Sequence, residues 1–141
     1  MTQEEKQLLI IDLCERLPYK VKVSVKHKDR NFDDIIDNLT GVLCAVYPDD
    51  ERIIVDELDK AIAPVNVRCG GFLLDESEAK PYLRSMSSMT DEEIIEWNIM
   101  ADNCNDKFDS CFIDYCNRKY IDYRGLISKG LALEAPEGMY G

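Results

Sequence analysis

Residues 20–28 constrain the fold of this chain more than any other stretch. Their sequence, KVKVSVKHK, places valines at odd positions and lysines at even positions. Successive side chains of an extended strand point to opposite faces of a sheet, whereas a helix would spread both kinds around its surface. The alternation predicts a β-strand with a buried valine face and an exposed lysine face. The valines are Val21, Val23 and Val25, and the lysines on the opposite face are Lys20, Lys22 and Lys26.

A helix is predicted before this strand. Thr2 and Glu5 have the T-x-x-E spacing of a capping box, in which the two side chains accept hydrogen bonds from amides of the first helical turn. Leu9 and Leu13 recur at four-residue spacing and give the helix one apolar face, and Pro18 ends it. We therefore expect this helix to pack its apolar face against another element.

Further short strands are expected between residues 39 and 74. Residues 39–47 and 52–58 are apolar or β-branched, and the Pro48-Asp49-Asp50-Glu51 segment between them favours a tight reversal, so they predict a hairpin. Residues 29–38, rich in Asp and Asn, are expected to form a loop. Two more strands, at residues 65–68 and 72–74, are expected around a sharp turn or bulge at Gly70-Gly71.

After residue 84 the pattern becomes helical. Thr90 and Glu93 form a second capping box, and Ile94, Trp97 and Ala101 follow at helical spacing. A third helix is predicted from an apolar stripe, and it is expected to pair with the second. The residues of this stripe are Phe108, Cys111, Phe112, Tyr115 and Cys116. A last short helix at residues 123–128 and an irregular tail from residue 134 complete the chain.

These patterns predict an α+β fold. It consists of an N-terminal helix, a small, curled, mainly antiparallel sheet and a C-terminal helical cap. About five strands are enough for such a sheet to form a half-barrel or a barrel. Residues 1–141 are expected to form a single domain, with the helix and sheet in residues 1–84 and the helical subregion in residues 85–141.

The charge balance and the apolar patterning limit the class of protein. The chain has 17 Lys and Arg against 28 Asp and Glu, which gives a formal net charge of −11. No window approaches the roughly 20 apolar residues of a membrane span, and the opening MTQEEK has no signal-peptide pattern, so we expect a cytoplasmic protein that does not enter membranes. The cysteine spacing lacks the close pairs of zinc sites, so reduced, metal-free thiols are expected. The cysteines are Cys14, Cys44, Cys69, Cys104, Cys111 and Cys116.

The lysine face is the strongest candidate for a ligand site. Its positive side chains could hold the phosphates of a small ligand, a nucleotide or a nucleic acid. The candidate residues are Lys20, Lys22, Lys26, Lys28 and Arg30. The alternative interpretation is a solvated outer face, or an edge strand that lysines protect from aggregation. The face carries no aromatic residue on which a base could stack, and the acidic remainder of the protein would repel a polyanion, so binding of duplex nucleic acid is not expected.

Candidates for catalysis are weaker. His27 is the single histidine, and its position on the valine side of the strand favours a structural role. Acidic residues gather at residues 33–37, 49–51, 56–59 and 91–96. We interpret these clusters mainly as solvated faces. The alternatives are a divalent-ion site, an enzyme site that includes His27, or mimicry of a nucleic acid. No nucleophile, zinc or phosphate-loop motif is present. We therefore expect no enzymatic activity, no catalytic residue, no metal and no cofactor.

Two segments resemble known sequences. Residues 80–90, KPYLRSMSSMT, and residues 122–132, DYRGLISKGLA, are similar to recurrent stretches in small uncharacterised proteins of phages and prophages of gut anaerobic bacteria. The resemblance implies a phage context and carries no known activity. The first hypothesis is therefore a non-enzymatic phage or prophage accessory protein that binds a host protein. The alternative is a small-ligand, nucleotide or nucleic-acid binding module that uses the lysine-rich strand at residues 20–30.

Overall fold

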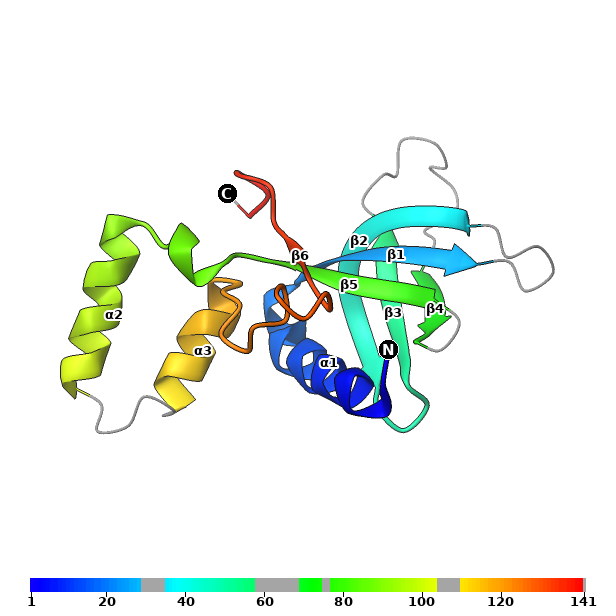
Figure 1. Cartoon of the computed structure of the whole chain (residues 1–141), viewed down its shortest axis with the longest axis horizontal. Helices are drawn as coiled ribbons and strands as arrows, with labels where there is room; N and C mark the ends of the chain where they lie inside the picture. Colours follow the sequence, from blue (N-terminus) through cyan, green and yellow to red (C-terminus); the bar gives the residue numbers. More distant parts are fainter. Residues whose placement is uncertain (29–34, 58–68, 75–76, 104–109, 141) are drawn as a thin grey trace. The chain divides into compact units, whose positions relative to one another are not determined.

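The computed structural model of the chain describes residues 1–28, 35–57, 69–74, 77–103 and 110–140 (Figure 1). The chain divides into two compact units, Met1–Tyr82 and Leu83–Gly141. The first holds a helix and an antiparallel sheet, and the second holds two helices with turns around them. The predicted α+β class is therefore confirmed.

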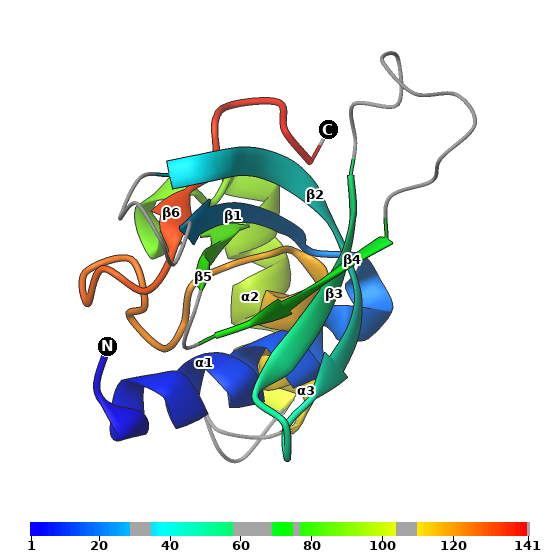
Figure 2. The same cartoon turned by 90° about the vertical axis from the view of Figure 1, so that its right-hand side faces the viewer.

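Helix α1 (Gln3–Arg16) begins and ends where the sequence predicts. The Glu5 amide donates to Thr2 Oγ1 at 3.1 Å, and the Thr2 amide donates to Glu5 Oε1 at 3.0 Å, which completes the capping box. The single turn η1 (Leu17–Tyr19) follows, with Pro18 inside it. Leu9 and Leu13 are buried, and α1 lies against one face of the sheet (Figures 1 and 2).

The sheet has the strand order β4-β3-β2-β1-β5-β6. The pairs β1–β2, β1–β5, β2–β3 and β3–β4 are antiparallel. Its strands are β1 (Lys22–Lys28), β2 (Ile35–Tyr47), β3 (Arg52–Glu57), β4 (Cys69–Leu73), β5 (Ser77–Leu83) and the short β6 (Leu133–Glu134). The strands bend, as β2 shows in Figure 2, but the sheet is open and the barrel alternative is wrong. Closure would need β5 to pair with β4, whereas the free side of β5 faces β6, with the Ala135 amide donating to the Leu83 carbonyl at 2.7 Å.

Strand β1 confirms the predicted valine face and corrects the lysine face. Val21, Val23 and Val25 are each 0% exposed. Lys22 and Lys26 are half-buried rather than exposed, because β1 lies between β2 and β5 and both neighbours cover its flanks. The exposed Lys20 precedes the strand, where it ends η1 with a positive φ of 57°. Since β1 is a central strand, the interpretation of its lysines as guards of a sheet edge is wrong.

Other strands differ from the prediction. The hairpin of β2 and β3 is confirmed, with Tyr47 opposite Arg52, but β2 begins at Ile35, inside the segment expected to be a loop. Gly70 and Gly71 lie within β4, opposite Val55 and Ile54, so the turn expected there is wrong. Strand β5, which has a weak β-pattern and contains Pro81, was not predicted at all. The strand expected at residues 65–68 lies outside the described residues.

Gly41 lies in the middle of β2, opposite Val23 of β1 and Glu57 of β3. A Cβ at this position would overlap the Asp56 carbonyl oxygen and the Val55 side chain. The backbone of β3 therefore approaches β2 so closely that only glycine fits.

The C-terminal unit contains η3 (Met86–Ser88), α2 (Asp91–Asn103) and α3 (Ser110–Arg118). The predicted pairing of the two helices is confirmed, since the ring centroid of Trp97 lies 4.7 Å from that of Phe112 and 6.2 Å from that of Tyr115. The apolar face predicted for α2 is only partly correct, because Ile94 and Ala101 are exposed.

The helix predicted at residues 123–128 is wrong, since a series of turns occupies this segment. The carboxylate of Asp122 accepts hydrogen bonds from the amides of Leu126 and Ile127 at 2.8 and 2.9 Å, and so holds the chain in a local turn. The tail beyond residue 134 packs within the unit, where the rings of Tyr120 and Tyr140 stack with centroids 3.7 Å apart.

We predict that Gly41→Ala lowers the free energy of unfolding by roughly 1–3 kcal/mol, because the added methyl group meets backbone that cannot move without distorting two strand pairs. Urea denaturation followed by far-ultraviolet circular dichroism measures the change. Cys44→Ala is the matched control on the same strand, and because Cys44 is exposed its effect should stay within about 0.5 kcal/mol. Equal stability of the two variants would contradict the close approach.

Candidate functional site

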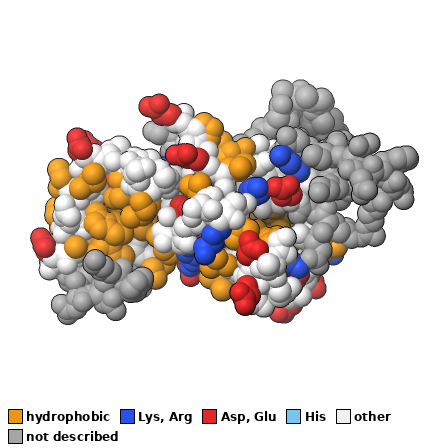
Figure 3. Space-filling model, in the orientation of Figure 1, with side chains coloured by type: hydrophobic (Ala, Val, Ile, Leu, Met, Phe, Trp, Pro, Cys, Tyr) orange, Lys and Arg blue, Asp and Glu red, His pale blue; other side chains and the backbone are white. Residues whose placement is uncertain are grey.

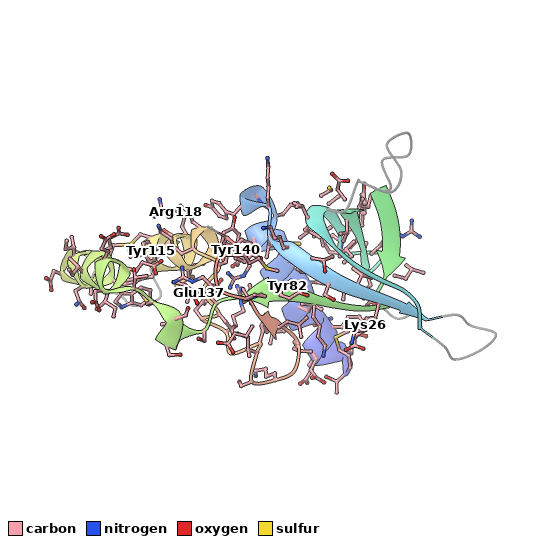
Figure 4. The ribbon with its side chains drawn as sticks, turned by 90° about the horizontal axis from the view of Figure 1, so that it is seen from above. Lys26, Tyr82, Tyr115, Arg118, Glu137 and Tyr140 are labelled. Atoms are coloured by element: carbon pink, nitrogen blue, oxygen red, sulfur yellow. The ribbon has the colours of Figure 1, made fainter. Side chains whose placement is uncertain are left out.

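The structure gathers only part of the predicted lysine site. Lys22 and Lys26 share one face of β1, and Lys26 lies opposite Glu78 of β5. Glu78 in turn forms an ion pair with Lys80 at 2.9 Å, so the face contains an acid as well as three lysines. Figure 4 shows Lys26 on β1. The side chain of Lys28 and all of Arg30 lie outside the described residues.

The other sequence candidates do not converge on a site. His27 is paired in register with Asp37 of β2 and Ser77 of β5, and its side chain is outside the description. Cys44 is exposed, and four cysteines in the described residues form no disulfide: Cys14, Cys44, Cys111 and Cys116. Among the described residues, no three His, Cys, Asp or Glu side chains are grouped to hold a metal ion. No helix within the described ranges has the length and apolar character that crossing a membrane requires.

An ion pair that sequence reasoning missed organises the C-terminal unit. The guanidinium of Arg84 donates to Glu93 through two parallel hydrogen bonds, Nη1 to Oε2 at 2.9 Å and Nη2 to Oε1 at 2.6 Å. Glu93 is also the capping-box acid of α2, and its Oε1 accepts from the Thr90 amide at 3.0 Å. One carboxylate therefore caps the helix and fixes the arginine.

Arg84 extends this ion pair to the rest of the unit. Its Nη2 donates to the Ser88 carbonyl at 3.1 Å and its Nη1 to the Lys119 carbonyl at 3.4 Å. Its backbone amide donates to the Tyr120 carbonyl at 2.7 Å, and its own carbonyl accepts from the Asp122 amide at 2.8 Å. A single residue thus joins the beginning of the unit to the first turn of α2 and to the segment after α3.

The contacts in this region shift the pKa values of Glu93 and Tyr115 in opposite directions. The hydrogen bonds from Arg84 lower the pKa of Glu93 from 4.5 to about 2, against the opposing effect of burial. Burial and the hydrogen bond that Tyr115 donates to Glu96, at 3.0 Å, raise the pKa of the Tyr115 hydroxyl to about 12. Glu93 is therefore charged and Tyr115 neutral across the whole physiological pH range.

A cavity of about 940 Å³ lies beside this ion pair, within the C-terminal unit. Its wall is formed by the first turns of α2, the end of α3 and the C-terminal segment, including the stacked Tyr120 and Tyr140. Figure 4 labels Arg118, Glu137 and Tyr140 among the residues that line it. Acids outnumber bases in the wall. The acids are Glu92, Glu93, Glu96, Glu134 and Glu137, and the bases are Arg84, Arg118 and Lys119.

The side of α2 that does not contact α3 exposes three isoleucines among polar residues. Ile94, Ile95 and Ile99 are 44%, 59% and 56% exposed. Figure 3 shows hydrophobic side chains gathered on the part of the surface that contains α2. We call Ile94, Ile95 and Ile99 the isoleucine face. Its sequence signal is that apolar residues occupy two sides of α2, one more than packing against α3 requires.

We predict that Glu93→Gln lowers the free energy of unfolding by about 2 kcal/mol at neutral pH, because the lowered pKa of Glu93 stabilises the folded state whenever the carboxylate is charged. This stabilisation is complete above pH 4.5 and disappears as the pH falls toward 2, so the difference between variant and wild type should shrink over that range. Glu92→Gln, on the same turn and exposed, is the matched control and should change stability by less than about 0.5 kcal/mol. Chemical denaturation at a series of pH values tests this, and a difference independent of pH would contradict it.

Comparison with known proteins finds no matching family model, no matching curated protein and no matching solved structure.

Proposed function

We propose that this chain is a non-enzymatic binding protein and that the isoleucine face of α2 is its contact surface for another protein. The observation that carries the proposal is the exposure of three large apolar side chains on one helix. Of the seven large hydrophobic residues that are exposed in the described part of the chain, three lie on α2. Grouped exposed apolar residues mark interaction surfaces, whereas single ones are normal.

The opposite side of α2 is anchored, which favours binding. Glu93 holds the first turn of the helix through Arg84, and Trp97 packs on Phe112 and Tyr115 in the middle of the helix. A surface that is fixed before a partner arrives loses little conformational entropy on binding. The isoleucine face is therefore presented in one orientation within the unit.

The shifted pKa values of Glu93 and Tyr115 argue against these two groups as general acids or bases. A general acid or base works best with a pKa near the operating pH. The pKa of Glu93 lies near 2 and that of Tyr115 near 12, so neither group titrates near neutral pH.

The proposed partner is a protein of a bacterial host, encountered in the cytoplasm. This part of the proposal is supported by the resemblance of residues 80–90 and 122–132 to phage and prophage proteins. The first of these segments contains Arg84 and the capping residue Thr90, so it includes the contacts that hold α2. The half-barrel form of the sheet and the C-terminal helical cap also remain predictions.

We predict that the double variant Ile95→Ser, Ile99→Ser loses binding to the host partner by at least about tenfold, because each buried isoleucine contributes roughly 1.5–3 kcal/mol. Affinity capture from host lysate followed by titration of the captured protein measures the loss. Ile11→Ser, on α1 and 51% exposed, is the matched control and should bind like the wild type. Equal capture by all three proteins would contradict the proposal.

The lysine strand is retained as the second candidate because Lys22, Lys26 and Lys80 lie on one face of the sheet. If it binds phosphate, replacement of Lys20, Lys22, Lys26 and Lys28 by glutamine should abolish an affinity for nucleotides or oligonucleotides that falls steeply with salt. Isothermal titration at two salt concentrations measures this affinity. If neither the wild type nor the variant binds, the lysines have no role in phosphate recognition.

A further inference from the structure

We infer that the isoleucine face receives an amphipathic helix whose apolar row is flanked by lysine and arginine. This inference rests on the proposed function and names the chemistry of the partner. It follows from the charges and the spacing of the side chains along α2.

Every charged side chain of α2 is acidic. The acids are Asp91, Glu92, Glu93, Glu96 and Asp102. Glu93 is neutralised by Arg84, whereas Asp91, Glu92, Glu96 and Asp102 are exposed. The helix surface that surrounds the isoleucines is therefore negative, and it is complementary to a positive partner.

The two outermost isoleucines of α2 lie in a row along the helix, with an aspartate at each end of the row. Asp91, Ile95, Ile99 and Asp102 follow one another at intervals of four, four and three residues, so they lie along one stripe of the helix with an acid at each end. Glu92 and Glu96 lie beside this stripe on one flank. An apolar stripe one helix in length is matched by the i, i+3, i+4, i+7 anchors of a second helix.

The cavity adds to the acidic flank. Glu92 and Glu96 belong both to the flank of the stripe and to the wall of the cavity. A lysine or arginine that extends from the partner helix over this flank therefore reaches a space that Glu134 and Glu137 also line. Glu93 in this wall is neutralised by Arg84, so the four remaining glutamates face two bases, Arg118 and Lys119. Long basic side chains suit such a site because their aliphatic stems can pack on the isoleucines while their charged ends reach the carboxylates.

The same charges argue against a second copy of this chain. Pairing of two α2 helices would place Glu92 and Glu96 of one copy near the acids of the other, in a protein whose net charge is −11. Like charges brought together across an interface oppose association. A partner of opposite charge meets no such opposition.

The test uses two synthetic helical peptides of about 18 residues, long enough to cover the roughly 20 Å length of α2. One combines leucine with lysine in an amphipathic pattern, and the other has glutamate in place of every lysine. Fluorescence anisotropy with the full chain measures both affinities at low and at physiological salt. We expect the leucine–lysine peptide to bind and the leucine–glutamate peptide not to bind.

Three variants locate the binding. Ile95→Ser, Ile99→Ser should weaken the leucine–lysine peptide at least about tenfold, and Glu92→Gln, Glu96→Gln about three- to tenfold with a shallower salt dependence. Asp49→Asn, Asp50→Asn removes the same amount of charge from the exposed turn between β2 and β3, and it should leave the affinity unchanged. If it weakens the peptide as much as the Glu92 and Glu96 changes, the attraction is non-specific and the inference fails.

The remaining outcomes separate this inference from the proposed function. If the host partner depends on Ile95 and Ile99 but the leucine–lysine peptide does not bind, or the leucine–glutamate peptide binds equally well, the inference fails and the proposed function stands. If the Ile95 and Ile99 changes affect neither the host partner nor the leucine–lysine peptide, the proposed function and the inference both fail. If sedimentation shows a wild-type dimer that the isoleucine variant abolishes, the occupant is a second copy and the inference is overturned.

Discussion

The C-terminal unit depends on the ion pair of Arg84 and Glu93. Removing a carboxylate and a guanidinium from water is costly, and such a pair stabilises a fold only when its geometry is good and its remaining hydrogen-bonding groups are satisfied. Both conditions hold here. The two ions meet through parallel hydrogen bonds of 2.9 and 2.6 Å, Arg84 also donates to the Ser88 and Lys119 carbonyls, and Glu93 accepts from the Thr90 amide. The pKa of Glu93, lowered to about 2, expresses the same balance.

The ion pair also decides which side of α2 is left outside. Glu93 is directed toward Arg84, and one turn later Trp97 is directed toward Phe112 and Tyr115. Met100 packs with Trp97 against the buried cluster of Tyr115, Cys116 and Ile121. With these residues on the inner side, helical geometry places Ile95 and Ile99 on the outer side. The exposed isoleucines are therefore a consequence of how the helix is anchored.

Local patterns predicted the elements whose cause is local. The capping residues Thr2 and Thr90, and the alternating valines of β1, each specify a conformation through neighbours a few residues away, and all of them are confirmed. Strand β5 and the glycines of β4 owe their conformation to partners distant in sequence, such as Val23 opposite Pro81 and Val55 opposite Gly70. The half-burial of Lys22 and Lys26 also depends on distant partners, because it follows from the central position of β1 in the sheet. The residues of β1 alone do not specify that position. The sequence pattern did not predict the role of Arg84, because this role depends on the chain bringing residue 84 back to the first turn of α2.

The incorrect prediction for α2 is informative about function. Its apolar residues occupy more of the helix surface than one packing partner can cover, so periodicity alone assigned Ile94 to the inner face together with Trp97. A helix with apolar residues on two sides is ordinarily buried on both. In the described structure α3 covers one side, and a sequence that departs from the pattern of a stable surface helix is expected to do so at functional sites. The second apolar side of α2, framed by Asp91 and Asp102, is not explained by packing within the described structure, and this is the surface that we propose for partner binding.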